Sequence, residues 1–304
     1  MRVLVTGAQG MLGSVLLPCL QAEHQVYGVD LRDFDIGEEA AVGRAFRQLR
    51  PEFVFHLAAF TDVDGCEANP QKAEQVNALG TRNVAGACAK IGAGMLYVST
   101  DYVFDGRGKR PCREDDCPNP LSVYGLTKLQ GERHVQALVA RHLIVRSSWL
   151  YGPGGKNFVA TILRLASEGR DLRVVSDQRG SPTYTRHLAI KLAELLATRE
   201  SGVFHVTGGG DCSWFEFAEA IVQAGGYPQV HVTAITTQEC GRLAARPAFS
   251  LLENRRLAES KLGALPNWTE GLARYLGEVS CRGEFRTQAP NPQEAPVARE
   301  VTKP

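Results

Sequence analysis

The sequence of 304 residues has no apolar run of 18 residues, so it predicts no helix that crosses a membrane. Its first residues, Met1 to Thr6, have the pattern of a strand and not of a secretory signal, which favours a cytoplasmic protein. An excess of one charge is also missing, because Lys plus Arg number 34 and Asp plus Glu number 33, for a net charge of +1. This balance gives no electrostatic footprint for nucleic acid or for an anionic membrane.

Several chemical motifs are absent as well. The eight cysteines form no Cys-x-x-Cys pair, and they are typical of reduced thiols in a cytosolic protein, not of a disulfide framework or zinc site. The seven histidines are isolated, so no metal cluster is indicated, and His56 within an apolar strand is expected in the core. Neither the Gly-x-Ser-x-Gly elbow nor the Gly-x-x-x-x-Gly-Lys-[Ser/Thr] loop occurs, which sets aside serine-hydrolase and phosphate-loop chemistry.

Apolar strands alternate with amphipathic helices over the first 150 residues. Strands are expected at 3–6, 25–30, 53–57, 95–100 and 142–146, and helices at 11–20, 38–50, 71–91 and 121–138. Such alternation predicts an α/β fold of Rossmann type, in which helices cover both faces of a doubly wound parallel sheet. A chain of this length can bury a sizeable core in one large domain or two small ones.

After about residue 150 the alternation of strands and helices becomes less regular. Helices are expected at 158–168, 188–198 and 214–224, and a strand at 203–206. We therefore expect a dinucleotide-binding domain at 1–150 and a smaller substrate-binding lobe at 151–280, and we leave open whether later segments return to the first domain. The polar, proline-rich stretch at 281–304 is expected to be a disordered tail, because it cannot bury enough apolar surface.

Three glycines follow the first strand and open the first helix. Gly7 allows a tight turn, Gly10 lets the backbone approach a pyrophosphate, and Gly13 allows close packing of helix and sheet. The spacing is Gly-x-x-Gly-x-x-Gly and not Gly-x-Gly-x-x-Gly, so the alternative is a turn that only packs. The motif, which includes Met11 and Leu12, predicts a site for NADH or NADPH.

The second strand ends on an acid. Asp30 lies where a carboxylate commonly binds the ribose hydroxyls of the adenosine, whereas Arg32 is placed to pair with a 2′-phosphate. These two residues favour different cofactors, so the choice between NADH and NADPH stays open. Asp35 and Ile36 are expected near the adenine, although Asp35 could equally be an ordinary loop aspartate.

Tyr124 and Lys128 stand four residues apart and share one helix face. A phenol has a pKa of about 10, and the Lys128 ammonium and an oxidised nicotinamide are both expected to lower it. Tyr124 would then act as a general acid toward the alkoxide formed from a carbonyl, while Lys128 binds the nicotinamide ribose. Thr100 ends the fourth strand, where its hydroxyl can hold the carbonyl. The alternative is an amphipathic helix with an exposed Tyr and Lys.

Taken together, the motifs resemble a known family. Over about residues 1–280 the sequence is similar to the extended short-chain dehydrogenase/reductases, and within them to the dTDP-4-dehydrorhamnose reductase family, which reduces the C4 ketone of a deoxythymidine-diphosphate 6-deoxyhexose. The strings that carry this resemblance are His56-Leu-Ala-Ala59 followed by Thr61-Asp-Val-Asp64 and Glu67, Ser99-Thr-Asp-Tyr-Val-Phe-Asp-Gly106, Pro120-Leu-Ser-Val-Tyr-Gly-Leu-Thr-Lys128, Arg146-Ser-Ser-Trp-Leu-Tyr-Gly152, Asn157-Phe158, Asp177-Gln-Arg-Gly-Ser-Pro-Thr183, and Arg246-Pro247 with Ser250.

The resemblance implies roles for particular residues. Thr100, Tyr124 and Lys128 would be the catalytic residues. Trp149 would stack on the sugar or base of the substrate, although a core position is the alternative for so large a side chain. The other residues implied at the cofactor are Ala58, Ala59, Thr61 and Asn77, and those implied at the substrate are Asp101, Tyr102 and Asn157.

The sequence departs from related proteins at two positions, and these departures restrict the metal, the dimer and the reaction that we expect. Some family members bind Mg²⁺ at a dimer interface through glutamates, one of them on the first helix, but this chain has Val15 there, so we expect neither that metal nor that dimer and leave open a monomer or a homodimer. Sugar-nucleotide dehydratases carry Asp-Glu after the threonine, whereas Asp101-Tyr102 follows here, so water elimination is not expected. The alternatives are another nucleoside-diphosphate 4-ketohexose reductase or epimerase, and a regulatory protein like the β-subunit of methionine adenosyltransferase.

Overall fold

The computed structural model describes residues 1–282 and 299–300. The predicted disorder of the tail therefore concerns residues that, apart from 281, 282, 299 and 300, lie outside the described part. Within that part, no helix is long and apolar enough to cross a membrane. All eight cysteines are free thiols.

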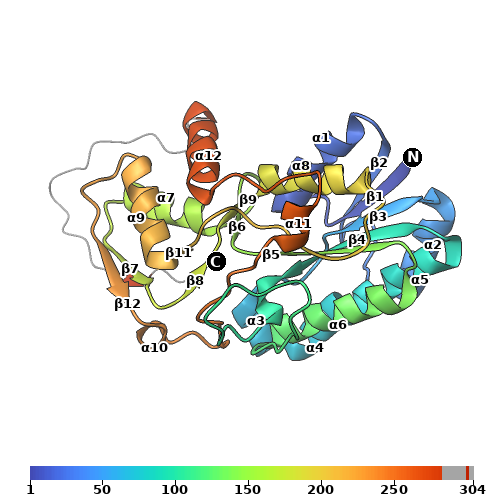
Figure 1. Ribbon diagram of the computed structural model, residues 1–304, viewed down its shortest axis with the longest axis horizontal. Coiled ribbons are helices and arrows are strands. Elements are labelled where there is room, and N and C mark those ends of the chain that lie inside the picture. Colours follow the sequence, from blue (N-terminus) through green and yellow to red (C-terminus); the bar gives the residue numbers. More distant parts are fainter. Residues whose placement is uncertain (283–298, 301–304) are drawn as a thin grey trace.

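The centre of the molecule is a six-stranded sheet in which every neighbouring pair is parallel (Figure 1). The predicted doubly wound parallel sheet is confirmed. Its order is β10-β5-β4-β3-β1-β2, so the chain moves in opposite directions after β1 and after β2. The strands are β1 (Arg2–Thr6), β2 (Gln25–Val29), β3 (Phe53–His56), β4 (Gly94–Thr100), β5 (His142–Ser147) and β10 (Gly202–His205).

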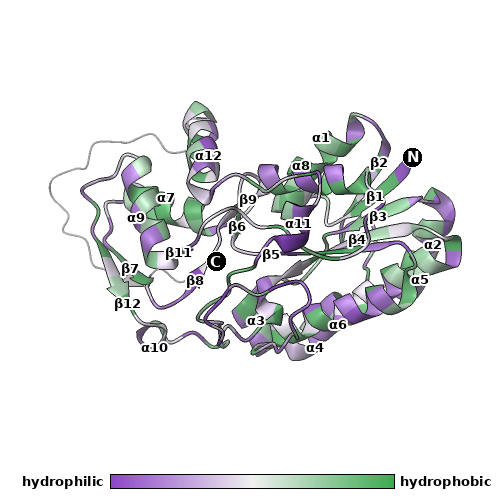
Figure 2. Ribbon diagram, in the orientation of Figure 1, coloured by the Kyte–Doolittle hydropathy of each residue, from purple (hydrophilic) through white to green (hydrophobic). Residues whose placement is uncertain are grey.

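Helices cover both faces of this sheet because alternate strand residues point to opposite sides. Val3 and Val5 pack with α1 (Met11–Gln21) and α8 (Thr185–Leu196), whereas Leu4 between them packs with the helices of the other face. Those helices are α2 (Glu39–Leu49), α5 (Thr81–Ile91) and α6 (Val123–Leu138). Figure 2 shows the sheet strands as mainly hydrophobic and the small surface helix α11 (Arg255–Glu259) as hydrophilic.

The predicted helix at 71–91 is helical, but its middle part is a π-helix and not an α-helix. It consists of α4 (Pro70–Ala73), a π-helical segment η1 (Glu74–Gly80) and α5. Within η1, the buried Asn77 amide exchanges hydrogen bonds with both backbone groups of Phe60, and the Thr81 hydroxyl donates to the Asn77 carbonyl. These side-chain contacts compete with regular helix bonding, and propensity alone does not reveal them.

A second lobe follows residue 150, but the chain also returns to the sheet. The lobe has an aromatic-rich core between α7 (Phe158–Ser167), α9 (Trp214–Ala224) and α12 (Trp268–Arg282), beside the parallel strands β7 (Leu172–Val175) and β12 (Val232–Ile235). In between, β10 pairs with β5 and α8 packs on α1, so residues 185–205 belong to the central sheet layer. The short elements are α3 (Val63–Ala68), η2 (Asp101–Val103), β6 (Leu150–Tyr151), β8 (Arg179–Gly180), β9 (Thr183–Tyr184), β11 (Cys212–Ser213), α10 (Thr237–Cys240) and β13 (Arg299–Glu300).

A buried ion pair joins β5 to α6. Both Arg146 and Glu132 are at most 4% exposed, and two guanidinium nitrogens donate to the carboxylate at 2.9 and 2.7 Å. The Ser99 hydroxyl on β4 donates to the same carboxylate at 2.5 Å. Charges removed from water in this way are tolerated only while they remain paired.

We expect Glu132→Ala to lower the free energy of unfolding by about 3–5 kcal/mol, because Arg146 would be left as an uncompensated buried charge. Urea unfolding followed by circular dichroism measures the loss. Glu270→Ala is the control, since the Glu270–Arg274 pair is solvent-exposed and its loss should change stability by only about 0.5 kcal/mol. Equal losses in the two variants would contradict a structural role for the buried pair.

Candidate active site

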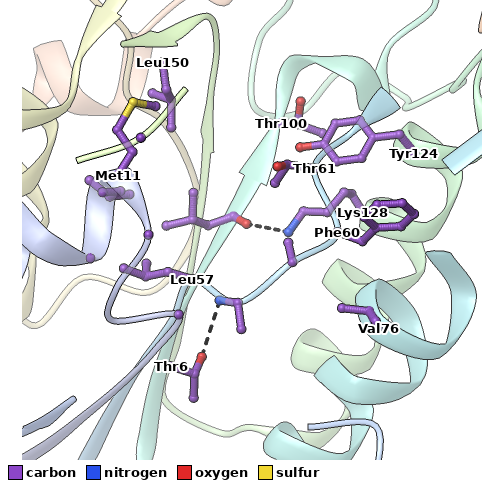
Figure 3. Close-up of a pocket in the computed structure, with 18 of the residues that line it drawn as sticks. Thr6, Met11, Leu57, Phe60, Thr61, Val76, Thr100, Tyr124, Lys128 and Leu150 are labelled. Atoms are coloured by element: carbon purple, nitrogen blue, oxygen red, sulfur yellow. Dashed lines mark hydrogen bonds between the residues drawn. The ribbon is translucent and has the colours of Figure 1, made fainter. Parts of the chain in front are cut away.

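A cavity of about 1270 Å³ opens at the carboxyl ends of the parallel strands. It is lined by the turn after β1, the ends of β2 and β3, the end of β4 and the segment after β5, together with 154–158 from the start of the second lobe. The position between β1 and β3 is where the strand order reverses, and ligands of open parallel sheets bind at that point. Figure 3 shows side chains from several of these elements around the cavity.

The three positions in the turn hold glycine for different structural reasons. Gly7 has φ +70°, and a Cβ there would lie 2.8 Å from the Ala58 nitrogen. A Cβ on Gly13 would overlap the carbonyl oxygens of Gly7 and Ala8. Gly10 has an ordinary φ of −69°, lines the cavity at the N-terminus of α1, and would meet only the Gly7 carbonyl, at 3.2 Å. Packing thus explains two of the glycines, while Gly10 leaves a helix N-terminus open to an anionic ligand.

The expected adenosine end of the cavity contains most of the predicted residues. Asp30, Asp35 and Ile36 line it, and Asp30 accepts the Gln9 N–H at 3.0 Å, which ties β2 to the glycine turn. Arg32 is exposed and does not line the cavity. Asp35 also accepts the Gly37 N–H at 2.7 Å, so it has the loop role that the sequence left open as its alternative. Met11 and Leu12 line the cavity as well.

The residues that the resemblance placed at the cofactor divide into two groups. Ala58, Ala59 and Thr61 line the cavity. Asn77 does not line it: its side chain is buried and holds the backbone of Phe60, which does line the cavity. Its effect on a ligand would be indirect. His56 is a core residue, as predicted, with its ring nitrogens bonded to the hydroxyls of Thr6 and Thr81.

Thr100, Tyr124 and Lys128 meet at the other end of the cavity (Figure 3). Thr100 is the last residue of β4, and Tyr124 and Lys128 are on the first turns of α6. The Tyr124 hydroxyl points toward Thr100 (Figure 3). Because Thr100 and Lys128 are buried and Tyr124 is half-buried, the alternative of an exposed Tyr and Lys on an amphipathic helix is wrong.

The electrostatics of this group are dominated by burial. Burial raises the pKa of Tyr124 well above its ordinary value, and the nearby Thr100 hydroxyl only partly offsets this. Burial also lowers the pKa of Lys128 to about 7, against the opposing attraction of Glu132. The expected lowering of the Tyr124 pKa is therefore not a property of the chain alone, because phenolate and ammonium both lose hydration in the same small space.

Lys128 is held in a fixed position between sheet and helix. Its ammonium donates to the Val98 carbonyl at 2.8 Å and lies 4.1 Å from the centre of the Tyr97 ring. Figure 3 shows this hydrogen bond and the neighbouring Tyr124 and Thr100. A lysine with restricted rotamers and a pKa near neutrality is suited to proton and hydroxyl chemistry.

Asp101 and Tyr102 continue the strand end into the cavity. The Thr100 hydroxyl accepts the Tyr102 N–H at 3.2 Å and donates to the Asp101 carboxylate at 3.1 Å. The Tyr102 ring contacts the edge of Tyr124 with ring centres 5.7 Å apart. Both residues line the cavity, and their contact with a substrate stays a prediction.

Trp149 lines the cavity but belongs largely to the core of the second lobe. It is 6% exposed, its indole stacks on Trp214 with centres 3.5 Å apart, and a Cβ on Gly180 would overlap the ring. Its φ of +49° is rare for a bulky residue, so the surrounding packing must hold it there. These contacts support the core alternative, and stacking on a substrate stays a prediction.

Asn157 caps a helix. Its side-chain oxygen accepts the Ala160 N–H, and its side-chain amide nitrogen donates to the backbone carbonyls of Gly152 and Gly155. The side chain lines the cavity, but these three bonds already use its oxygen and its amide nitrogen, so a bond to substrate stays a prediction. An asparagine directly before the helix expected at 158 is a recognised capping signal that the sequence analysis did not use.

Several cavity residues were not anticipated. Ser147 ends β5 and Ser148 follows it, at the sheet edge where ligands collect, and that position was the signal for them. Lys156 lies in the glycine-rich loop after β6, where the sequence carries no comparable signal. Over residues 1–282 and 299–300, no three acidic, histidine or cysteine side chains gather as a metal site. Val15 packs within an apolar cluster, so it offers no oxygen to a cation.

Known proteins share this fold and site region. The sequence matches the family described as RmlD substrate binding domain over residues 1–281. It is 42% identical to the spore coat polysaccharide biosynthesis protein SpsK of Bacillus subtilis (strain 168), covering 92% of this chain and 98% of that protein. It is 41% identical to a dTDP-4-dehydrorhamnose reductase of Streptomyces griseus, covering 89% and 91%.

A solved structure agrees with the sequence relatives. The crystal structure of dTDP-4-dehydrorhamnose reductase from Bacillus anthracis str. Ames in complex with NADP has a TM-score of 0.89 and 40% identity, covering 91% of this chain and 99% of that one. A family match over almost the whole chain, supported by relatives and by a structure of the same kind, leaves one assignment. The chain belongs to the RmlD substrate binding domain family, that of the dTDP-4-dehydrorhamnose reductases.

Proposed function

We propose that this protein reduces the C4 ketone of dTDP-4-dehydro-L-rhamnose with NADPH or NADH, giving dTDP-L-rhamnose. The observation that carries the proposal is the meeting of Thr100, Tyr124 and Lys128 at one end of a cavity whose other end is a glycine turn. Family membership supports the substrate, since relatives that share 33–41% identity carry the name of this reductase. The relative solved with NADP supports the cofactor.

The residues present fit a dinucleotide. Gly10 leaves the N-terminus of α1 uncovered for a pyrophosphate, and Asp30 offers a carboxylate to the ribose hydroxyls. Ala58, Ala59 and Thr61 would border the middle of the cofactor. When bound, the nicotinamide supplies a hydride to the carbonyl carbon. Asp30 also fits NADH, so both cofactors should be assayed.

The residues of the chain handle the proton. Tyr124 stays protonated because burial raises its pKa, so its hydroxyl is available to donate to the ketone oxygen as that oxygen gains charge. Thr100, which lines the same end of the cavity, orients the same oxygen. Lys128, beside the tyrosine, stabilises the phenolate that remains and binds ribose hydroxyls. One hydride on carbon and one proton on oxygen convert the ketone to the hydroxyl.

The substrate is placed between the two lobes in this proposal. Residues 154–158 and Trp149 come from the start of the second lobe and line the same cavity as the catalytic residues. We assign the nucleotide-sugar contacts to this side, and the cofactor contacts to the sheet side. Free thiols in all eight cysteines are compatible with the proposed location in the cytoplasm.

A turnover assay tests the proposal. NADPH and NADH oxidation is followed against a panel of nucleoside-diphosphate 4-ketohexoses, and the product is identified by NMR. The proposal predicts turnover of the dTDP-4-dehydrorhamnose with a rhamnose-configured product. A preference for another sugar would indicate a different reductase of this scaffold, and no turnover of any sugar would indicate the regulatory alternative.

Tyr124→Phe should lower kcat by about 10²–10⁴-fold, the usual contribution of general acid catalysis. The phenyl ring keeps the packing against Tyr102, so NADPH affinity measured by calorimetry should change little. A variant with wild-type turnover would remove Tyr124 from the mechanism.

Gly10→Val should raise the Kd for NADPH by at least about tenfold, because a branched side chain would occupy the approach of the pyrophosphate. The free protein should stay folded, since a Cβ at this position meets only one backbone oxygen. Gly13→Val is the contrast, and its thermal midpoint should fall because the side chain would overlap two carbonyl oxygens. Unchanged affinity of the Gly10 variant for both NADH and NADPH would argue against a phosphate turn.

Lys128→Met should change how stability depends on pH. Burial lowers the pKa of Lys128 from 10.5 to about 7, so between these values the unfolded chain binds more protons at this group than the folded protein. Stability therefore rises with pH across that window, and below pH 7 the penalty of the buried charge is fully present.

Relative to Lys128→Met, the wild type should gain stability from pH 7 to about pH 9, approaching about 1.4 kcal/mol per pH unit. Urea unfolding of both proteins at each pH measures this difference, and the variant should also lose turnover. A stability difference that is constant with pH would show that Lys128 keeps an ordinary pKa in the folded protein.

A further inference from the structure

The short helix α3 binds a segment that is distant in sequence. Asp64, in its first turn, accepts hydrogen bonds from Arg242 at 2.8 Å and from Arg246 at 3.1 and 2.9 Å. It also accepts the Ala244 N–H at 3.0 Å, and Arg246 donates to the Ala244 carbonyl at 2.9 Å. One carboxylate thus fixes three residues within a stretch of five.

That stretch begins a longer segment, which we call the strap, residues 242–250. Further along the strap, the Phe249 N–H donates to the Gly106 carbonyl of the sheet lobe, and the Ala248 carbonyl accepts the Arg179 N–H of the second lobe. The strap therefore runs between the two lobes and contacts both. Its first residues have no strand or helix to hold them, so the Asp64 contacts determine their position.

The strap contacts the catalytic tyrosine through one intermediate side chain. Ala244, Val63 and Tyr102 form a small apolar cluster, and Tyr124 packs against it. Arg246 also lies near Tyr102, since burial raises the pKa of Tyr102 and the Arg246 charge partly offsets that rise. A displacement of the strap would therefore also shift Tyr102, whose ring contacts the edge of Tyr124.

A second acid of α3, Glu67, binds the start of α6, the helix that carries Tyr124. The Glu67 carboxylate accepts the Val123 N–H at 3.1 Å, at the first residue of α6 and next to Tyr124. Asp64 and Glu67 stand three residues apart and share one face of α3. A carboxylate at a helix N-terminus is also favoured by the helix dipole. The two acids thus fix the surroundings of Tyr124 from two directions.

We propose that Asp64 is a positioning residue of the reductase, which holds the strap so that Tyr102 keeps Tyr124 in line with Thr100. The proposal rests on the proposed function for its kinetic part. The alternative is an ion pair that stabilises the protein without any effect on the site. The geometry favours positioning, because Ala244, a partner of Asp64, packs with Tyr102, whose ring contacts the catalytic tyrosine.

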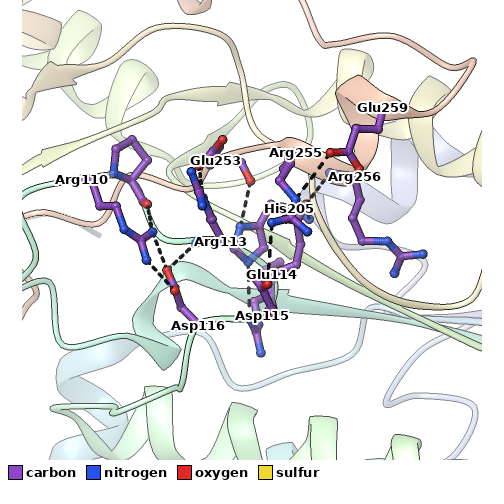
Figure 4. A network of polar contacts seen from close by, with 12 residues as sticks. Arg110, Arg113, Glu114, Asp115, Asp116, His205, Glu253, Arg255, Arg256 and Glu259 are labelled. Carbon is purple, nitrogen blue, oxygen red and sulfur yellow. Dashed lines mark hydrogen bonds and ion pairs between the residues drawn. The ribbon is translucent and has the colours of Figure 1, made fainter.

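The test compares Asp64→Asn with a matched control, Asp116→Asn. Asp116 likewise accepts two guanidinium hydrogen bonds, from Arg110, and one backbone N–H, from Arg113. The pKa of each carboxyl is lowered to about 2, for Asp116 chiefly by Arg110, and for Asp64 by Arg246 and the Ala244 N–H, which outweigh burial. Asp116 lies in a polar network away from the cavity lining (Figure 4).

Steady-state kinetics, NADPH titration and thermal unfolding are measured for both variants. Asp64→Asn should lower kcat by about 10- to 100-fold, the range for a small misplacement of a catalytic group, and leave the Kd for NADPH within about twofold. Asp116→Asn should keep wild-type kcat. A fall in melting temperature with normal kcat in the Asp64 variant would make the ion pair merely stabilising and overturn the proposal.

Hydrogen exchange separates this inference from the proposed function. In Asp64→Asn, amides of 242–250 and of 100–104 should both exchange faster, because the strap and Tyr102 would loosen together. Faster exchange in the strap alone would overturn the mechanical link whatever the activity. If both segments loosen but the wild type turns over no 4-ketohexose, the link stands and the proposed function fails.

Discussion

Parallel pairing of six strands brings every strand's carboxyl end to one edge of the sheet, and the rest of the molecule depends on that constraint. The chain leaves β1 toward β2 on one side and then crosses from β2 to β3 on the other side of β1, which opens a gap at the edge between β1 and β3. The glycine turn, the end of β4 and the first turns of α6 all border this gap. Backbone suited to binding a phosphate and side chains suited to donating a proton therefore lie at the same edge of the sheet.

Burial determines the chemistry at the inner end of the gap. A phenol and an ammonium are placed where water has little access, so the tyrosine keeps its proton and the lysine pKa approaches neutrality. Because water has little access, the charged groups nearby must be paired. The Glu132 carboxylate accepts hydrogen bonds from the Arg146 guanidinium and from the Ser99 hydroxyl. Stability and reactivity thus share one set of buried groups on α6, β4 and β5.

The two lobes are joined by more than covalent connection. The strap passes from the second lobe back to the sheet, and its first residues are bound by Asp64 on α3. Trp149 has a comparable position on the other side, since it lines the cavity and at the same time stacks within the aromatic core of the second lobe. A site built at such a junction can respond to both lobes, which suits a reaction that brings a cofactor and a sugar nucleotide together.

The sequence by itself determined the features that depend on near neighbours in the chain. Glycines at 7, 10 and 13 after a strand, a Tyr and a Lys on one helix face, and alternating strands and helices to residue 146 all appear in the structure as expected. Tertiary structure decided what depends on distant partners. Asp64 meets Arg246 across 182 residues of chain, β10 returns to pair with β5, and Asn77 in the π-helical segment binds the backbone of Phe60. Periodicity reports which face of an element is buried, but not which element covers it, so such pairings and the burial that shifts each pKa are set only when the chain is packed.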